Sequence, residues 1–193
     1  GDAKKFPTKE HGNPPNPKSP YALQKYTGEV FCKMFSNLFG FDTVSLRYFN
    51  IFGPGQYGYL AYATVVCNWL ESIYFPERQK AFLAGDGRQS RDFCYVENVV
   101  DANIRVMLSH RNFAGEVFNI GSGTRTNLFA VKRLIERHTG RELDLVRRPH
   151  QLGDIRHTHA DISKARRWFG YRPAVNFETG LRRTIEWFEK RRR

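Results

Sequence analysis

Tyr21 and Lys25 are the two residues of this chain whose types and spacing most directly suggest chemistry. Positions four apart lie on one face of a helix, so the two side chains would reach a common site. A phenol is a weak base at neutral pH because its ordinary pKa is about 10. A nearby ammonium favours the phenolate, which makes Tyr21 a candidate proton acceptor or donor. Solvated helices carry the same spacing, so the pair gains weight only from its surroundings.

The ends of a helix that carries this pair can be predicted from the sequence. Residues 1–19 are rich in proline and indicate an extended loop. Ser19 is a good N-cap, and Pro20 suits the first helical position. The helix is expected to run to about residue 38 and to end at Gly40. Its apolar face is wide enough to be buried and consists of Val30, Phe31, Met34, Phe35 and Leu38.

The rest of the chain alternates between β-prone and helical segments. Strands are expected over residues 43–49, 91–96, 116–120 and 143–147, with a short strand and turn over 81–87. Helices are expected over 61–73 and 180–191, and after caps at Asn98, at Thr126 or Asn127, and at Asp161. The capped helices should end near residues 108, 139 and 170. This alternation with short connections is typical of an α/β fold.

Composition indicates a folded domain with an excess of positive charge. The chain has 193 residues, 40% of them hydrophobic, and a formal net charge of +12. Such a charge raises the hypothesis of nucleic-acid binding. No zinc finger, helix-turn-helix or RNA-binding signature accompanies it. Many of the cations fall near the ends of predicted helices, where solvated cations are expected in any case. Nucleic acid is therefore not the favoured partner, and anionic small molecules are another use for the positive charge.

The cysteines and the hydropathy pattern favour a cytoplasmic protein. Cys32, Cys67 and Cys94 are far apart and odd in number, which indicates buried, reduced thiols. Nothing resembles a signal peptide, and no apolar run approaches the ~20 residues that cross a bilayer. We therefore expect no membrane partner.

His157 and His159 are the only residues whose spacing suggests a metal site. Two residues apart on a strand, they could face the same site, but the sequence offers no third and fourth ligand. We expect no metal.

Five segments together carry a family resemblance. In chain order they are SPYALQKYTGE, LRYFNIFGPGQ, GDGRQSRDFCYVENVVDA, VFNIGSG and GDIRHTHADISKA. They resemble successive motifs of NAD-dependent nucleotide-sugar epimerases and dehydratases, which are extended members of the short-chain dehydrogenase/reductase superfamily. The resemblance covers essentially the whole chain. It is closest to UDP-glucose and UDP-N-acetylglucosamine 4-epimerases.

One part of the family pattern is missing. Such enzymes begin with a βαβ unit whose glycine-rich turn binds the pyrophosphate of NAD, and this chain has no such turn after a strand. We therefore expect the C-terminal part of an extended Rossmann-type enzyme, without the N-terminal glycine-rich half. Residues 1–60 would be a remnant of the dinucleotide-binding domain. Residues 61–193 would form a small α/β substrate-binding domain, with some segments returning to the Rossmann sheet.

The resemblance implies roles for the opening pair of residues. In the family, the tyrosine removes a proton from the sugar 4-hydroxyl while a hydride passes to NAD. Tyr21 and Lys25 match the catalytic pair, and both would contact the cofactor, the lysine through the nicotinamide ribose. Tyr48 would lie beside the nicotinamide through its backbone.

The resemblance also implies a substrate site. Asn50 and Arg91 would contact the diphosphate, and a guanidinium matches phosphate oxygens well. Phe82 would lie against the uracil ring, and Asp154 would contact the nucleotide ribose. From the residues alone, Asn50 could equally be a turn former, and Phe82 could equally be ordinary core.

The chain departs from the family pattern at Gln151, where the family usually has arginine. The diphosphate would lose one cation unless Arg148 or Arg156 compensates.

Four functions follow as hypotheses. The preferred one is NAD-dependent 4-epimerisation of a UDP-hexose or UDP-N-acetylhexosamine, with no turnover by this chain alone because its NAD pocket is incomplete. The second is another reaction of the family, either UDP-glucuronate decarboxylation or dTDP-glucose 4,6-dehydration. The third is a non-catalytic relic that binds nucleotide-sugars. The fourth is a basic nucleic-acid-binding module.

The resemblance finally implies a homodimer. Family members dimerise through a four-helix bundle that includes the Tyr-Lys helix. The second helix of the bundle would lie upstream of this chain, so we expect the face with Phe31, Phe35 and Leu38 to be partly uncovered.

Overall fold

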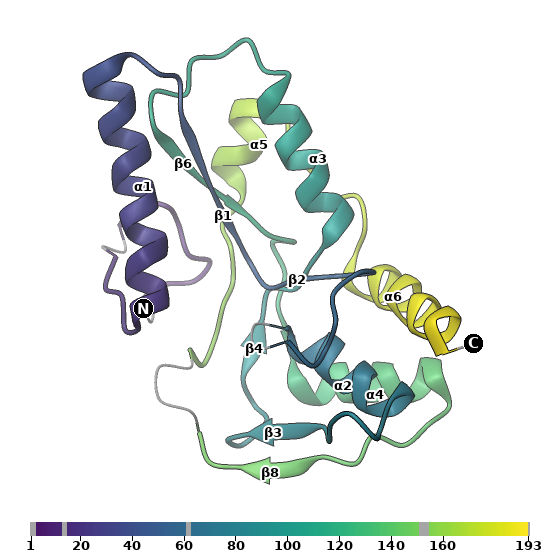
Figure 1. Ribbon diagram of the computed structural model, residues 1–193. Helices are drawn as coiled ribbons and strands as arrows, with labels where there is room; N and C mark the ends of the chain where they lie inside the picture. Colours follow the sequence, from purple (N-terminus) through teal and green to yellow (C-terminus); the bar gives the residue numbers. More distant parts are fainter. Residues whose placement is uncertain (1–2, 13–14, 61–62, 151–154, 193) are drawn as a thin grey trace.

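A computed structural model describes residues 3–12, 15–60, 63–150 and 155–192 and has a mixed α/β fold (Figure 1). The helices are α1 (Pro20–Phe39), α2 (Val65–Tyr74), α3 (Val96–Met107), α4 (Leu128–Thr139), α5 (Ser163–Phe169) and α6 (Phe177–Arg192). The strands are β1 (Val44–Tyr48), β2 (Ile51–Phe52), β3 (Phe82–Ala84), β4 (Ser90–Arg91), β5 (Cys94–Tyr95), β6 (Glu116–Ile120), β7 (Thr126–Asn127) and β8 (Val146–Arg148). The predicted α/β alternation is confirmed.

The strands form short pairs, most of them parallel. β1 pairs with β6 in parallel, from Val44 opposite Glu116 to Tyr48 opposite Ile120. β2 pairs with β5 and β3 with β8, also in parallel, whereas β4 and β7 are antiparallel. Parallel partners need crossover connections, and here these include helices α2, α3 and α4. The single strand expected over 91–96 is wrong, because β4 and β5 are separate strands with different partners.

Local capping explains where α1 and α4 begin and end. The Ser19 side chain accepts a hydrogen bond from the backbone N–H of Ala22 at 3.1 Å, and the Asn127 side chain accepts one from Ala130 at 2.8 Å. Gly40 ends α1 in the left-handed conformation, with φ +70°. These predicted ends are confirmed.

Two predicted helix starts are wrong, for reasons of tertiary contact. Asn98 lies inside α3, because its side chain bonds the backbone of Val175, donating to the oxygen at 2.8 Å and accepting from the nitrogen at 3.0 Å. Gly180 lies inside α6, where an added Cβ would approach the ring of Tyr95 to 2.7 Å. Both residues serve long-range packing rather than helix initiation.

Other boundaries shift by a few residues. α2 begins at Val65, later than predicted, and β8 begins at Val146, three residues after the predicted start of that strand. The N-cap of α5 is Ile162, while the Asp161 side chain accepts a hydrogen bond from the Ser163 N–H at 2.9 Å.

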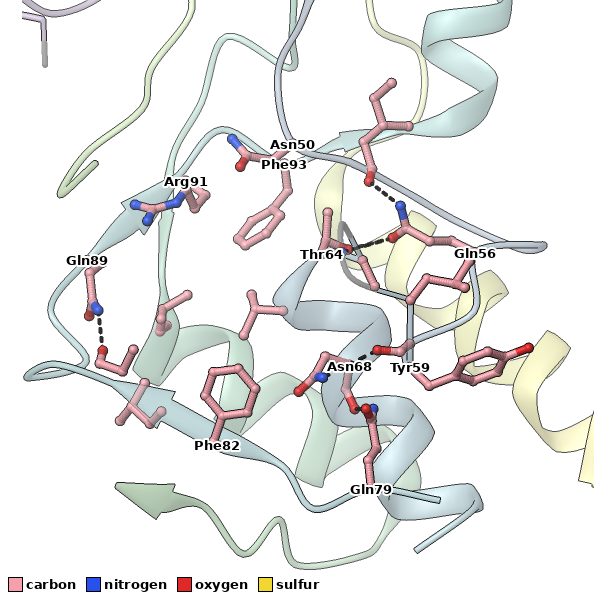
Figure 2. Close-up of a pocket in the computed structure, with 18 of the residues that line it drawn as sticks. Asn50, Gln56, Tyr59, Thr64, Asn68, Gln79, Phe82, Gln89, Arg91 and Phe93 are labelled. Carbon is pink, nitrogen blue, oxygen red and sulfur yellow. Dashed lines mark hydrogen bonds between the residues drawn. The ribbon is translucent and has the colours of Figure 1, made fainter. Parts of the chain in front are cut away.

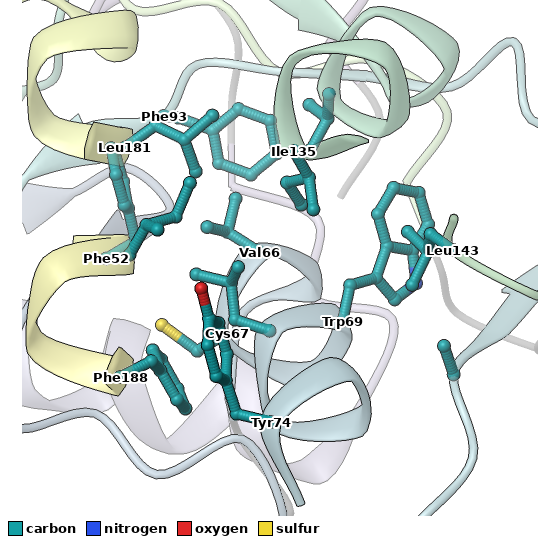
Figure 3. Close-up of a cluster of buried hydrophobic side chains, with 14 of the residues drawn as sticks. Phe52, Val66, Cys67, Trp69, Tyr74, Phe93, Ile135, Leu143, Leu181 and Phe188 are labelled. Atoms are coloured by element: carbon teal, nitrogen blue, oxygen red, sulfur yellow. The ribbon is translucent and has the colours of Figure 1, made fainter. Parts of the chain in front are cut away.

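Two buried clusters form the core. One joins α2, α4 and α6, with Trp69, Ile135 and Phe188 fully or almost fully buried (Figure 3). The other packs α3 and α5 against the β1–β6 pair, around Phe118 and Tyr171. Cys67 and Cys94 are buried and Cys32 is half-buried, and all three thiols are free. Within the described residues, no helix is long and apolar enough to span a bilayer.

The Asp92 carboxylate, between β4 and β5, links segments that are far apart in the chain. It is fully buried and accepts hydrogen bonds from the N–H and hydroxyl of Ser122, each at 2.7 Å, from Gly123 N–H at 3.2 Å and from Ala160 N–H at 2.9 Å. Burial raises the pKa of Asp92, against the opposing effect of these hydrogen bonds. One side chain therefore joins three distant segments.

Helix α1 lies at the edge of the molecule (Figure 1) and contains no buried residue. Polar contacts hold it: Arg47 donates two hydrogen bonds to Glu29 at 2.7 Å, and Lys33 donates to the Ala114 oxygen at 3.1 Å. Phe31 and Leu38 are 51% and 68% exposed, so the expectation of a partly uncovered face is confirmed.

Replacing Asp92 by alanine should lower the free energy of unfolding by about 3 kcal/mol, because several buried N–H groups lose their acceptor. Chemical denaturation followed by circular dichroism measures the change. The exposed Asp144 supplies the control, since Asp144→Ala should stay within about 0.5 kcal/mol. Equal effects of the two substitutions would contradict this account of Asp92.

Introducing Phe31→Glu together with Leu38→Glu on α1 should reduce self-association of the chain, because the substitutions break up an exposed apolar patch. Light scattering should then give a mass nearer the 22.5 kDa of one chain than the unmodified protein does. Gln24→Glu, on a polar position of the same helix, should leave the mass unchanged. A monodisperse monomer without any substitution would rule out the prediction.

Candidate functional site

A cavity of about 760 Å³ lies where α1, the end of β1, α2, β3 and β4 meet (Figure 2). Its lining comes from segments that are far apart in the chain, and it includes Tyr21, Tyr48, Asn50, Phe82 and Arg91. The structure thus brings together five of the seven residues singled out from the sequence.

Tyr21 and Lys25 lie on the same face of α1. The Lys25 ammonium is 5.3 Å from the centre of the Tyr21 ring, and Tyr21 is 48% exposed at the cavity. Tyr21 shares the cavity with Arg91, and Lys25 lies beside Tyr21 without being among the residues that line the cavity. The proton-transfer role of the pair stays a prediction.

Arg91 is held at the cavity wall by backbone carbonyls. Its Nη1 donates to the oxygens of Ser90 and Arg156, each at 3.1 Å. Fixing the guanidinium in this way lowers the entropy that a bound anion would have to remove. The arrangement suits a fixed positive charge beside the cavity.

Asn50 follows β1 and has a structural role that the sequence did not suggest. Its Nδ2 donates to the backbone oxygen of Asp92 at 3.1 Å and to the Thr158 hydroxyl at 2.8 Å. The side chain therefore ties the end of β1 to the segment around Asp92, at the top of the cavity in Figure 2.

Phe82, on β3, is half-buried and lines the cavity. The Arg148 guanidinium lies 4.2 Å from the centre of its ring, a cation–π contact that the parallel β3–β8 pairing brings about. Arg156 instead pairs with Asp86 at 2.8 Å. Of the two arginines that could compensate for Gln151, Arg148 places its guanidinium against a cavity residue, whereas the guanidinium of Arg156 is paired with Asp86.

The remaining predicted residues differ in how far the structure describes them. Tyr48 lines the cavity and donates its hydroxyl to the Asn103 side chain at 2.9 Å, so its ring leans toward α3. Asp154 and Gln151 lie outside the described residues. Among the described residues, no group of three or more potential metal ligands occurs. His157 and His159 bond elsewhere, to the Ser90 hydroxyl at 2.8 Å and the Gly123 oxygen at 3.0 Å.

A set of amide side chains that was not predicted from the sequence also lines the cavity. They are Gln56, Asn68, Gln79 and Gln89. Gln89 is 3% exposed and donates to the Ala84 oxygen, and its Oε1 is the one buried side-chain polar atom without a hydrogen-bond partner among the described residues. A buried acceptor without a donor is costly unless a ligand supplies one. Amides carry no distinctive spacing, which is why no pattern in the sequence indicated them.

Comparison with known proteins assigns the family. The model of the NAD dependent epimerase/dehydratase family matches residues 1–121. The chain belongs to this family. Its fold matches the C-terminal portion of extended short-chain dehydrogenase/reductase epimerases.

Relatives and solved structures agree on this assignment. The UDP-glucose 4-epimerase of Mycolicibacterium smegmatis is 33% identical over 186 residues, which are 96% of this chain and 58% of the relative. The crystal structure of UDP-glucose 4-epimerase from Thermotoga maritima with UDP-glucose is 36% identical, with a TM-score of 0.89 over 98% of this chain and 59% of that one.

A second similar structure contains the cofactor. UDP-glucuronic acid 4-epimerase from Bacillus cereus, in complex with UDP-glucuronic acid and NAD, is 26% identical, with a TM-score of 0.87 over 98% of this chain and 58% of that one. The chain thus spans somewhat under 60% of the length of these three proteins.

Proposed function

We propose that this chain forms the nucleotide-sugar-binding part of an NAD-dependent 4-epimerase acting on a UDP-hexose or UDP-N-acetylhexosamine. The observation that carries the proposal is the convergence of Tyr21, Arg91 and Phe82 on one cavity of about 760 Å³. These residues are far apart in the sequence, and they supply the three chemistries that such a substrate needs: a proton acceptor, a cation and an aromatic surface.

Tyr21 would take the proton of the sugar 4-hydroxyl, and Lys25 would favour the phenolate form. NAD, when bound, supplies a reversible hydride acceptor for C4. Return of the hydride to the opposite face of C4, with return of the proton to the oxygen on C4, would invert that carbon. Tyr21 is exposed at the cavity and Lys25 is exposed beside it on α1, which fits a cofactor approaching from outside this part of the fold.

The other residues would hold the nucleotide diphosphate. Arg91 would face the phosphates, with Asn50 beside it, and Phe82 would lie against the uracil ring, backed by Arg148. Asp154 would contact the ribose and Tyr48 the nicotinamide.

The choice of reaction and sugar rests on the relatives. Proteins similar to this chain in sequence or structure are named as 4-epimerases of UDP-glucose, UDP-N-acetylglucosamine and UDP-glucuronic acid, which favours 4-epimerisation over decarboxylation or dehydration. We extend the proposal to the division into a dinucleotide-binding remnant (1–60) and a substrate domain (61–193), and to a homodimer formed through α1.

Calorimetric titration with UDP and with UDP-glucose tests the proposal. Binding should be saturable, and Arg91→Ala should weaken it about 10- to 100-fold, the loss expected for charge-assisted hydrogen bonds of about 1.5–3 kcal/mol. Arg88→Ala is the matched control, because Arg88 is exposed on the adjacent turn and should change affinity by less than about 2-fold.

A parallel titration with duplex DNA distinguishes the alternative raised by the net charge. Tight DNA binding that weakens steeply with salt, without saturable UDP binding, would overturn the proposal in favour of a nucleic-acid partner. UDP binding that Arg91→Ala leaves unchanged would contradict the assigned role of Arg91.

A further inference from the structure

Residues 56–60 form one wall of the cavity and are held from behind. Gln56, Gly58 and Tyr59 line the cavity, whereas Tyr57 lies on the side of α6 with its ring 5.8 Å from that of Trp187 (Figure 2 shows Gln56 and Tyr59). Gly58 presses against α2 so closely that an added Cβ would come within 2.1 Å of the Cys67 oxygen. The shape of this wall therefore depends on what lies behind it.

Glu71 lies behind the wall. Its side chain is fully buried on α2, and its Oε2 accepts a hydrogen bond from the Gly58 N–H at 3.1 Å. Arg78 donates to the same carboxylate at 3.1 Å. Burial acts to raise the pKa of Glu71, but the hydrogen bonds from Arg191, Gly58 and Arg78 outweigh it and hold that pKa below its ordinary value. The buried group is thus a carboxylate that needs cations.

The main cation comes from the last turn of α6. Arg191 donates Nη2 to one oxygen of Glu71 at 2.5 Å and Nη1 to the other at 3.1 Å. Its guanidinium lies 4.2 Å from the Phe75 ring centre and 4.8 Å from that of Tyr57, and Trp187 and Phe188 are within 5.3 Å. Such a slot between aromatic rings fixes a planar guanidinium in place.

We propose that Arg191 is a positioning residue, which fixes the cavity wall at residues 56–60 through Glu71 and Tyr57 and so sets the affinity for the nucleotide-sugar. The inference rests on the proposed function, because the cavity must bind such a ligand. Helix α6 would thus influence the shape of the cavity, although Arg191 itself is not among the residues that line it.

The test combines hydrogen exchange with calorimetry, using UDP as the probe and the full chain. In Arg191→Ala, amide exchange should rise about tenfold or more in residues 56–60 but not in α4, and UDP should bind about tenfold more weakly. Arg191→Lys retains one charged donor and should recover most of the affinity. Arg183→Ala is the matched control, because Arg183 lies on the same helix and pairs with the exposed Glu97 at 2.6 Å.

The outcomes separate this inference from the proposed function. Absence of UDP binding by the unsubstituted chain would defeat the proposed function, and the inference with it. UDP binding that Arg191→Ala and Arg183→Ala change equally, or a rise in exchange throughout the core, would leave Arg191 a general structural role and overturn the inference alone. Should Arg191→Ala not fold, Arg191→Gln decides, because it removes the charge and keeps much of the side chain: a rise in exchange confined to residues 56–60 supports the inference, and unchanged exchange there overturns it.

Discussion

The buried Asp92 carboxylate is the interaction on which the rest of this structure depends. It accepts backbone hydrogen bonds from the turn at Ser122 and Gly123 and from Ala160, and its own backbone bonds Asn50 and Thr158. A buried carboxylate is tolerated only when such donors surround it. Since those donors come from segments far apart in the chain, satisfying Asp92 fixes where β4, β5 and β6 end relative to one another.

That constraint explains why the cavity forms where it does. Arg91 directly precedes Asp92, and Asn50 donates a hydrogen bond to the Asp92 backbone from the end of β1. The hydrogen bonds around Asp92 therefore position both residues. α/β folds commonly place ligands at strand ends, where chain segments diverge. On the opposite wall a second buried carboxylate, Glu71, fixes the backbone of Gly58. The cavity thus lies between two buried acids, each satisfied by different segments.

Local chemistry made part of this predictable from the sequence. Ser19, Gly40 and Asn127 act through neighbours within a few residues, so their helix ends could be predicted. Asn98 and Gly180 could not, because distant partners determine their roles. The shared position of Tyr21 and Arg91 was expected from the family resemblance and not from spacing, whereas the amides at the cavity had no signal in the sequence.

The net charge of +12 is a poor guide to the partner, because several cations act within the fold. Arg191 and Arg78 neutralise a buried carboxylate, Arg47 holds α1 to β1 through Glu29, and Arg148 lies against an aromatic ring. A cation committed to such a contact contributes little to a surface field that nucleic acid would need, since its partner or its burial offsets it. The position of a cation is therefore more informative than the total charge, and Arg91 at the cavity wall is the arginine that favours an anionic ligand.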